Sequence, residues 1–170
     1  MKDFSHIGSE EKAKEDINQA INSSTVVSQS EWKIVAQMKT ELDPSLPMVE
    51  CFIGDIKQVV LNLIVNAAHA IKDALELEDS ENKQGLITVR TYAKNASIFI
   101  TVSDTGTGIP EEVRDRVFDH FFTTKEVGKG TGQGLSMAYQ TITEKHKGKI
   151  SFETEKGKGT TFIVELPMRG

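Results

Sequence analysis

The chain has 170 residues, of which 38% are hydrophobic and 26% are charged, and its formal net charge is −5. This length and composition indicate one soluble globular domain with its own core, and the acidic charge argues against a protein that binds nucleic acid. A single cysteine excludes an intrachain disulfide, and no apolar run approaches the roughly 20 residues that span a bilayer. We therefore expect a cytoplasmic domain that contacts neither nucleic acid nor membrane.

The first third of the chain predicts one helix and two strands. Residues 10–24 are charged and then weakly amphipathic, with Ile17 and Ile21 on the same side, and they predict a helix. Residues 32–38 alternate as a strand does, and residues 48–52 predict a shorter strand after a loop that contains prolines.

The strongest periodicity predicts a long helix over residues 55–77. Apolar residues recur there as on a helix with one buried face: Ile56, Val59, Val60, Leu63, Ile64, Ala67 and Ile71. A polar stripe follows beside them, formed by Gln58, Asn62, Asn66, His69 and Asp73. Asparagine is a mediocre helix former, and its amide oxygen is a hard neutral ligand that suits Mg²⁺. Taken alone, the stripe is better explained by solvated surface residues than by a metal site.

A predicted hairpin leads into a possible base-binding pocket. Residues 86–92 and 97–103 alternate polar and apolar side chains, and the second strand ends at Asp104, before Gly106 and Gly108. A carboxylate there can accept a hydrogen bond from an exocyclic amine such as that of adenine, and glycines let the backbone approach a ligand closely. The same pattern also makes a plain turn, and this segment alone supports both interpretations about equally.

The rest of the chain predicts a short helix, a glycine-rich loop, a further helix and two closing strands, at residues 110–116, 128–134, 133–146, 148–154 and 160–166. A turn at Gly157 and Gly159 separates the closing strands. Helices between mostly hairpin-connected strands favour an α/β fold, a two-layer sandwich of helices over a mixed, largely antiparallel sheet.

Glycine occupies every second position of residues 128–134, which excludes regular helix and strand there. Because this loop leads into a helix N-terminus, where backbone amides attract anions, it fits a phosphate-binding lid. A loose surface loop would also explain the glycines, but it would not need Phe118, Phe121 and Phe122 just before them. We expect these rings to dock the edge of the lid on the core.

Five motifs in this order resemble the N, G1, F, G2 and G3 boxes of sensor histidine kinases. They are Asn62-x-x-x-Asn66, Asp104-x-Gly106-x-Gly108, Phe118-x-x-Phe121-Phe122, Gly130-x-Gly132-x-Gly134 and Gly157-x-Gly159-Thr160. The chain is similar, over nearly its whole length, to the catalytic ATP-binding domain that these kinases share with the gyrase and MutL ATPases, the Bergerat fold. The resemblance implies residues 16–170 as this domain and residues 1–15 as an extension that follows dimerisation helices absent from the chain.

The resemblance implies a role in ATP binding for residues from these motifs and their neighbours. They are Asn62, Asn66, His69, Asp104, Gly106, Gly108, Ile109, Lys125, Gly130, Thr131, Gly132, Gln133, Gly134, Leu135 and Thr160. Asn66 would be the Mg²⁺ ligand, with Asn62 supporting it. Asp104 would accept a hydrogen bond from the adenine amine, and the Thr160 hydroxyl would assist.

On the phosphate side, His69 stands where the family often has a basic residue that faces phosphate, and Lys125 would be a cation of the lid. The three glycines of the G2 box would line the triphosphate. Gln133 replaces a leucine that is common between the last two of these glycines, a difference that need not affect ATP binding.

One position distinguishes the two activities of the family. The ATPase branch has a glutamate that activates water where this chain has Asn62, and an amide cannot take that proton. The nearest acids in sequence, Asp55 and Asp73, lie roughly two to three helical turns away. The sequence therefore favours transfer of the γ-phosphate to an external nucleophile over ATP hydrolysis.

The resemblance implies that this nucleophile is a histidine of the dimerisation helices and that a response regulator receiver domain is a further partner. None of the chain's own histidines, His6, His69, His120 and His146, lies in the expected sequence context. We therefore expect the catalytic half of a larger histidine kinase, monomeric as a fragment. The alternatives are a serine protein kinase of the anti-sigma-factor type, a self-contained ATPase of the same fold, and a non-catalytic nucleotide-binding module.

Overall fold

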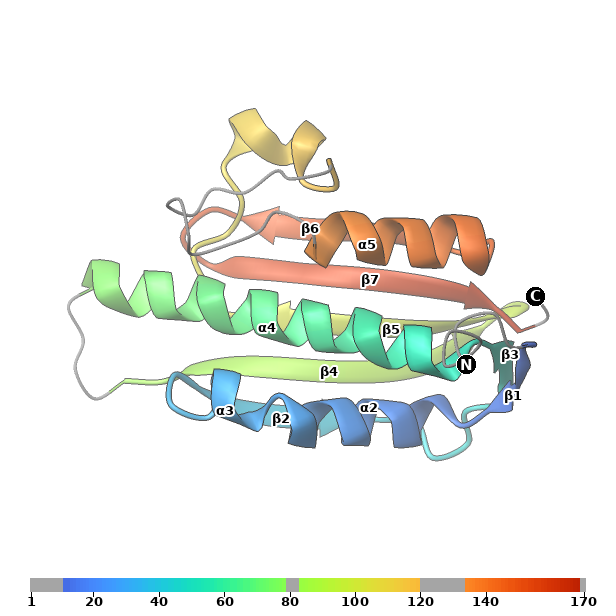
Figure 1. Cartoon of the computed structure of the whole chain (residues 1–170). Coiled ribbons are helices and arrows are strands. Elements are labelled where there is room, and N and C mark those ends of the chain that lie inside the picture. Colours follow the sequence, from blue (N-terminus) through green and yellow to red (C-terminus); the bar gives the residue numbers. More distant parts are fainter. Residues whose placement is uncertain (1–10, 79–82, 120–133, 169–170) are drawn as a thin grey trace, which may run out of the picture.

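The structure, a computed structural model, describes residues 11–78, 83–119 and 134–168. A layer of helices covers one face of a five-stranded mixed sheet (Figure 1). The strands, in spatial order, are β2 (Ala36–Glu41), β4 (Gly85–Lys94), β5 (Ser97–Asp104), β7 (Gly159–Pro167) and β6 (Lys149–Glu155). Strand β2 is parallel to β4, and the other neighbouring pairs are antiparallel. This is the predicted α/β sandwich, so the fold class is confirmed.

Three helices run side by side along the sheet, with α4 in the middle (Figure 1). They are α2 (Ile17–Val27), α4 (Ile53–Glu78) and α5 (Gly134–Gln140). After β5 the chain forms a 3₁₀ helix, η1 (Glu111–Arg116). Helix α5 continues directly into a π-helical turn, η2 (Thr141–Lys145). No helix among the described residues is long and apolar enough to span a bilayer.

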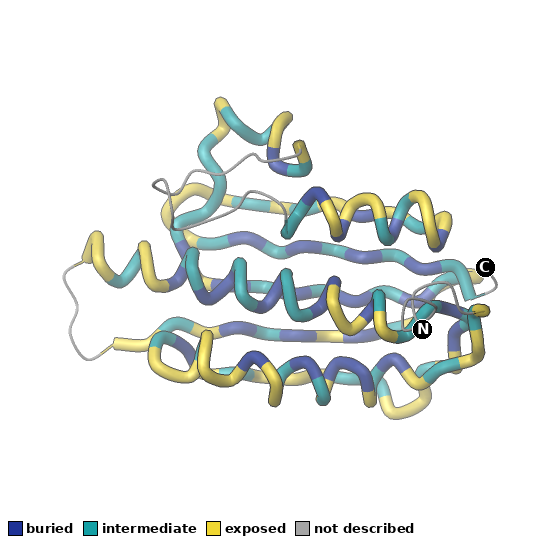
Figure 2. The backbone as a smooth tube through the Cα atoms, viewed as in Figure 1, coloured by how far each residue is buried: buried dark blue, intermediate teal, exposed yellow. Residues whose placement is uncertain are grey.

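The core lies between α4 and the sheet, and Figure 2 shows the buried residues gathered there. The predicted apolar face of α4 is buried as a whole, because its members recur at helical spacing and meet the alternating apolar residues of β4, β5 and β7. The same packing turns the polar stripe of α4 to one side of the core. This orientation is what makes a site possible there.

The structure corrects the first predicted helix and adds a short strand before it. The helix predicted over residues 10–24 begins only at Ile17, because the side chain of Asp16 caps it by accepting from the Gln19 amide at 3.1 Å. Residues 13–15 just before it form strand β1 (Ala13–Glu15), which pairs antiparallel with β3 (Val49–Cys51) in a separate small sheet. The short strand predicted at residues 48–52 is therefore confirmed.

The strand predicted over residues 32–38 is wrong in its first half. Residues 29–32 form a short helix, α3 (Gln29–Trp32), and the Trp32 indole donates to the Thr25 carbonyl at 3.1 Å, which ties this turn to α2. Strand β2 starts later, at Ala36.

The remaining described elements lie close to their predicted ranges. The hairpin of β4 and β5 turns at Asn95, whose φ is 59°, and the hairpin of β6 and β7 turns at Gly157 and Gly159, whose φ angles are 85° and 140°. Residues 79–82, Phe121, Phe122 and the residues of the predicted glycine-rich loop before Gly134 lie outside the described residues.

Candidate functional site

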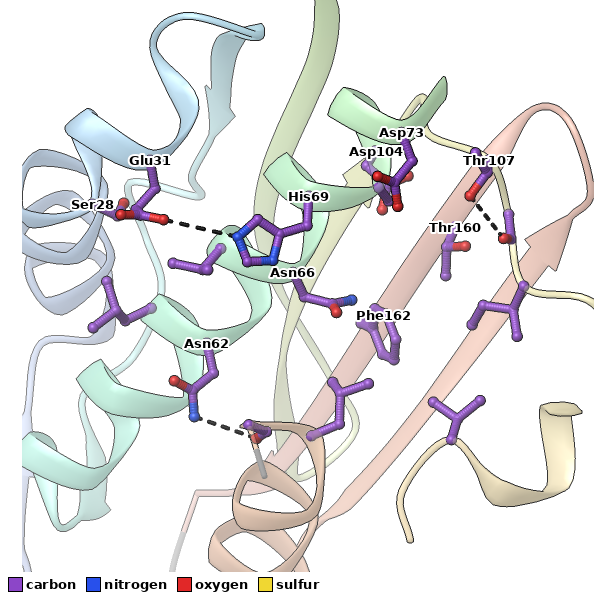
Figure 3. Close-up of a pocket in the computed structure, with 18 of the residues that line it drawn as sticks. Ser28, Glu31, Asn62, Asn66, His69, Asp73, Asp104, Thr107, Thr160 and Phe162 are labelled. Atoms are coloured by element: carbon purple, nitrogen blue, oxygen red, sulfur yellow. Dashed lines mark hydrogen bonds and ion pairs between the residues drawn. The ribbon is translucent and has the colours of Figure 1, made fainter. Parts of the chain in front are cut away.

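A cavity of about 540 Å³ lies between α4, the segment after β5 and the start of α5 (Figure 3). Its volume is typical of a small-molecule site. Nine of the residues predicted for ATP binding line it: Asn62, Asn66, His69, Asp104, Gly108, Ile109, Gly134, Leu135 and Thr160. Gly106 is not among the lining residues and packs against Ala70 of α4. Five further predicted residues fall outside the described part of the chain: Lys125, Gly130, Thr131, Gly132 and Gln133.

Asp104 ends β5 at the wall of the cavity with only 7% of its surface exposed. One carboxylate oxygen, Oδ1, accepts a hydrogen bond from the Gly106 amide at 2.8 Å. Burial raises the pKa of this carboxyl to about 6, although hydrogen bonds from the Gly106 and Thr160 backbones lower it. The carboxyl group is therefore mostly ionised at neutral pH, and it is a hydrogen-bond acceptor in the wall of the cavity.

The glycines after Asp104 allow the chain to pass between α4 and the β6–β7 turn. A Cβ on Gly106 would lie 2.6 Å from the Ala70 Cβ, so this segment packs directly against α4. Gly108 has a φ of 77°, and a Cβ there would lie 2.4 Å from the Glu155 carbonyl oxygen. Both positions need glycine for close approach, but the close neighbours seen here are α4 and the end of β6, whereas the sequence predicts close approach to a ligand.

Helix α4 presents its polar stripe to the cavity, with Asn62, Asn66, His69 and Asp73 in its lining. Both ends of the Asn62 amide are occupied, since Oδ1 accepts from Gln58 at 2.9 Å and Nδ2 donates to the Gly134 carbonyl at 3.3 Å. Asn62 thus ties α4 to the first residue of α5.

Asn66, one turn further along, points toward Phe162 across the cavity (Figure 3). Within the described part of the chain its amide makes no hydrogen bond, so its oxygen is available to a ligand. A carboxamide oxygen in this position fits a hard cation such as Mg²⁺.

The ring of His69 turns toward α3, where Nε2 lies 3.9 Å from Oε1 of Glu31 (Figure 3). Glu31 also lines the cavity, and sequence reasoning missed it because it lies far from α4 along the chain, in a segment without periodicity. Its acidic character alone could not have identified it. Of the two acids weighed from the sequence, Asp73 lines the cavity, whereas Asp55 forms an ion pair with Lys145.

Phe118 packs as expected for a residue that docks on the core. Its ring centroid lies 5.3 Å from that of Tyr139 on α5, 5.9 Å from that of Phe152 on β6 and 6.2 Å from that of Phe162 on β7. The other two phenylalanines of this motif lie outside the described residues.

Comparisons with known proteins agree with this geometry. Residues 53–170 match the family described as histidine kinase-, DNA gyrase B- and HSP90-like ATPase. The sensor kinase CckA of Brucella abortus is 40% identical over 146 residues, which cover 77% of this chain and 14% of CckA. The sensor histidine kinase ZraS of Escherichia coli K12 is 34% identical over 154 residues, which cover 90% of this chain and 30% of ZraS. The chain thus spans less than a third of either curated relative.

Solved structures are similar over most of the chain. A nucleotide-free catalytic domain of histidine kinase ThkA has a TM-score of 0.78 and 30% identity, covering 94% of this chain and 97% of that domain. A structure of ThkA in complex with the response regulator protein TrrA has a TM-score of 0.69 and 26% identity, covering 92% of this chain and 42% of that one. The chain therefore belongs to the histidine kinase-, DNA gyrase B- and HSP90-like ATPase family, as a catalytic domain of the sensor histidine kinase type.

Proposed function

We propose that this domain binds Mg-ATP and transfers the γ-phosphate to a histidine in a dimerisation domain outside this chain. The observation that carries the proposal is the position of Asp104, a buried and mostly ionised acceptor in the same cavity as the Asn66 amide. The adenine amine donates to Asp104, and the triphosphate extends from there along α4. Gly106, Gly108, Ile109 and Thr160 shape the base pocket.

On the phosphate side, Asn66 is the residue that would hold Mg²⁺, since its amide oxygen is available within the described structure. When bound, the cation neutralises charge on the phosphate oxygens. Asn62 supports this arrangement by fixing the start of α5. His69 and Lys125 are the candidate basic residues on the phosphate side, and residues 130–135, Thr131, Gln133 and Leu135 included, are proposed to bind the triphosphate.

We favour transfer over hydrolysis because of the residue at position 62. The Asn62 amide uses its oxygen and nitrogen in hydrogen bonds and has no proton-accepting carboxylate. Besides Asp104, the acids Glu31 and Asp73 line the cavity, and we assign neither to the activation of water. Glu31→Gln and Asp73→Asn should therefore leave the slow basal ATP hydrolysis unchanged. Turnover near the ~10 per second typical of enzymes, lost in either variant, would revive the self-contained ATPase.

The proposal extends to location and partners. We propose a cytoplasmic domain that is monomeric as a fragment and that acts with a response regulator receiver domain, as the complex of the similar kinase ThkA with TrrA suggests. Residues 16–170 are proposed as the catalytic domain, although β1 precedes this boundary and pairs with β3.

The test is a transfer assay with ATP labelled at the γ-phosphate. The chain alone should not label itself, whereas a dimerisation domain that carries a histidine should become labelled, and the label should be lost in acid. A matched dimerisation domain with its histidine replaced by alanine is the control. Acid-stable label on a sigma-antagonist substrate would instead support a serine kinase, and nucleotide binding without any transfer would support a non-catalytic module.

A further inference from the structure

Behind the base pocket, three hydrogen bonds converge on the hydroxyl of a residue that does not line the cavity. Thr154 lies on β6, directly across from Thr160 on β7. Its Oγ1 accepts from the Ile109 amide at 2.9 Å, donates to the Gly159 carbonyl at 3.1 Å and lies 2.9 Å from the Thr160 Oγ1. Two of these partners, Ile109 and Thr160, line the cavity.

The chemistry of a hydroxyl group fixes the direction of each bond. A hydroxyl has one proton and two lone pairs. Since a carbonyl only accepts and an amide only donates, the Thr154 proton goes to Gly159 and one lone pair takes the Ile109 N–H. The second lone pair is left for the Thr160 proton. Thr160 therefore donates to Thr154, and its oxygen presents only lone pairs toward the cavity.

This arrangement places two acceptors side by side in the base pocket. Asp104 and Thr160 are direct partners in the pairing of β5 with β7, and both are buried. Two acceptors favour a ligand group that offers N–H donors, such as an exocyclic amine, and disfavour a carbonyl in its place. A backbone hydrogen bond also holds the loop that carries Ile109, since the Gly157 amide donates to the Thr107 carbonyl at 2.7 Å.

We propose that Thr154 is a positioning residue for the base: by fixing the Thr160 hydroxyl and the Ile109 amide, it selects a purine with an amine over one with a carbonyl. The inference rests on the proposed nucleotide-binding function. Thr154 acts through its neighbours and touches no ligand itself.

The test compares ATP with inosine triphosphate, which carries a carbonyl where adenine carries its amine. In Thr154→Val, the Thr160 proton loses its acceptor and becomes free to donate to that carbonyl. We expect ATP affinity to fall roughly tenfold while the affinity for inosine triphosphate holds or rises, so their ratio falls. Thr154→Ser should restore the ratio. Titration calorimetry gives the affinities, and urea unfolding reports the fold of each variant.

Thr161→Val is the matched control. Thr161 lies on the same hairpin but on the opposite face of the sheet, where its hydroxyl is 2.8 Å from that of Ser103, so its loss should leave the ratio unchanged. If Thr154→Val does not fold, Thr154→Ala takes its place, and the same ratio of ATP affinity to inosine triphosphate affinity is measured. An equal loss for both nucleotides, or no loss, overturns the role of Thr154 while the wild type still binds ATP. A wild type that binds neither nucleotide contradicts the proposed function itself.

Discussion

In the proposed function, the carboxyl group of Asp104 lies buried in the base pocket and must be charged to accept well, and burial opposes that charge. Its pKa of about 6 in the folded chain lies above the ordinary value of 3.8, and burial is the main cause. Above pH 6 the folded state holds a buried charge, and below about pH 4 the group is neutral in both states. This group therefore makes folding less favourable as pH rises from about 4 to 6, by on the order of 3 kcal/mol.

Asp104→Asn should separate the two requirements. ATP and ADP affinities should fall at least tenfold, because the amide can present an N–H where the adenine amine needs an acceptor. The free energy of unfolding at pH 7 should not fall, since a buried charge is removed. Wild-type ATP affinity should itself decline as pH drops through about 6. Calorimetry at pH 7 and below pH 6 measures the affinities, and urea unfolding at pH 7 measures the free energy of unfolding.

The control is Asp43→Asn, a carboxylate that accepts from the Ser45 amide away from the cavity. It should leave nucleotide binding unchanged. An ATP affinity that survives Asp104→Asn intact would remove the adenine role of Asp104.

Asn66→Ala should weaken ATP binding in the presence of Mg²⁺ by about tenfold or more and leave binding in a chelator nearly unchanged, because only the metal contact is lost. Titrations with and without Mg²⁺ measure the difference. Asn22→Ala, an exposed asparagine on α2, is the matched control. Full Mg²⁺ dependence in Asn66→Ala would contradict its assignment as the ligand.

At the scale of elements, α4 carries both the core and the site, and its apolar face should dominate stability. Leu63 is fully buried there, whereas Leu77 on the same helix is 80% exposed. Leu63→Ala should lower the free energy of unfolding by about 2–5 kcal/mol, and Leu77→Ala should change it little. Urea unfolding of both variants tests this, and equal losses would contradict the burial of this face.

Elements with strong local periodicity were predictable, and those set by single tertiary contacts were not. The range of α4 follows from apolar residues that recur at helical spacing along its length, and the hairpin of β4 and β5 follows from the alternation of polar and apolar residues. By contrast, α3 is held against α2 by an indole hydrogen bond from Trp32, and β1 pairs with a strand distant in sequence. Glu31 entered the site for the same reason, because the position of α3 beside His69 is a property of packing. Asn66 and Asp104 were singled out because five motifs in a fixed order resemble those of a known family, and both residues line the cavity.

At the scale of the whole molecule, the small sheet of β1 and β3 crosses the proposed domain boundary at residue 16, so removing β1 tests that boundary. Beginning the chain at Asp16 removes β1 and its pairing with β3, so the urea midpoint should fall while ATP binding is retained. Removing only residues 1–10 leaves that pairing in place and is the control. Loss of ATP binding in the folded shorter chain would move the functional boundary to include β1.

The strand order of the main sheet bears on whether two copies of the domain can associate through their sheet edges. Strands β2 and β6 are its two edges, and an unpaired edge can recruit a strand from a neighbouring molecule. Lys39 and Glu41 are exposed on β2, and Lys149, Glu153 and Glu155 are exposed on β6. Charged side chains at an edge disfavour such pairing, because adding a strand would desolvate them. Two copies of this domain brought close together would thus not be expected to join their sheets edge to edge.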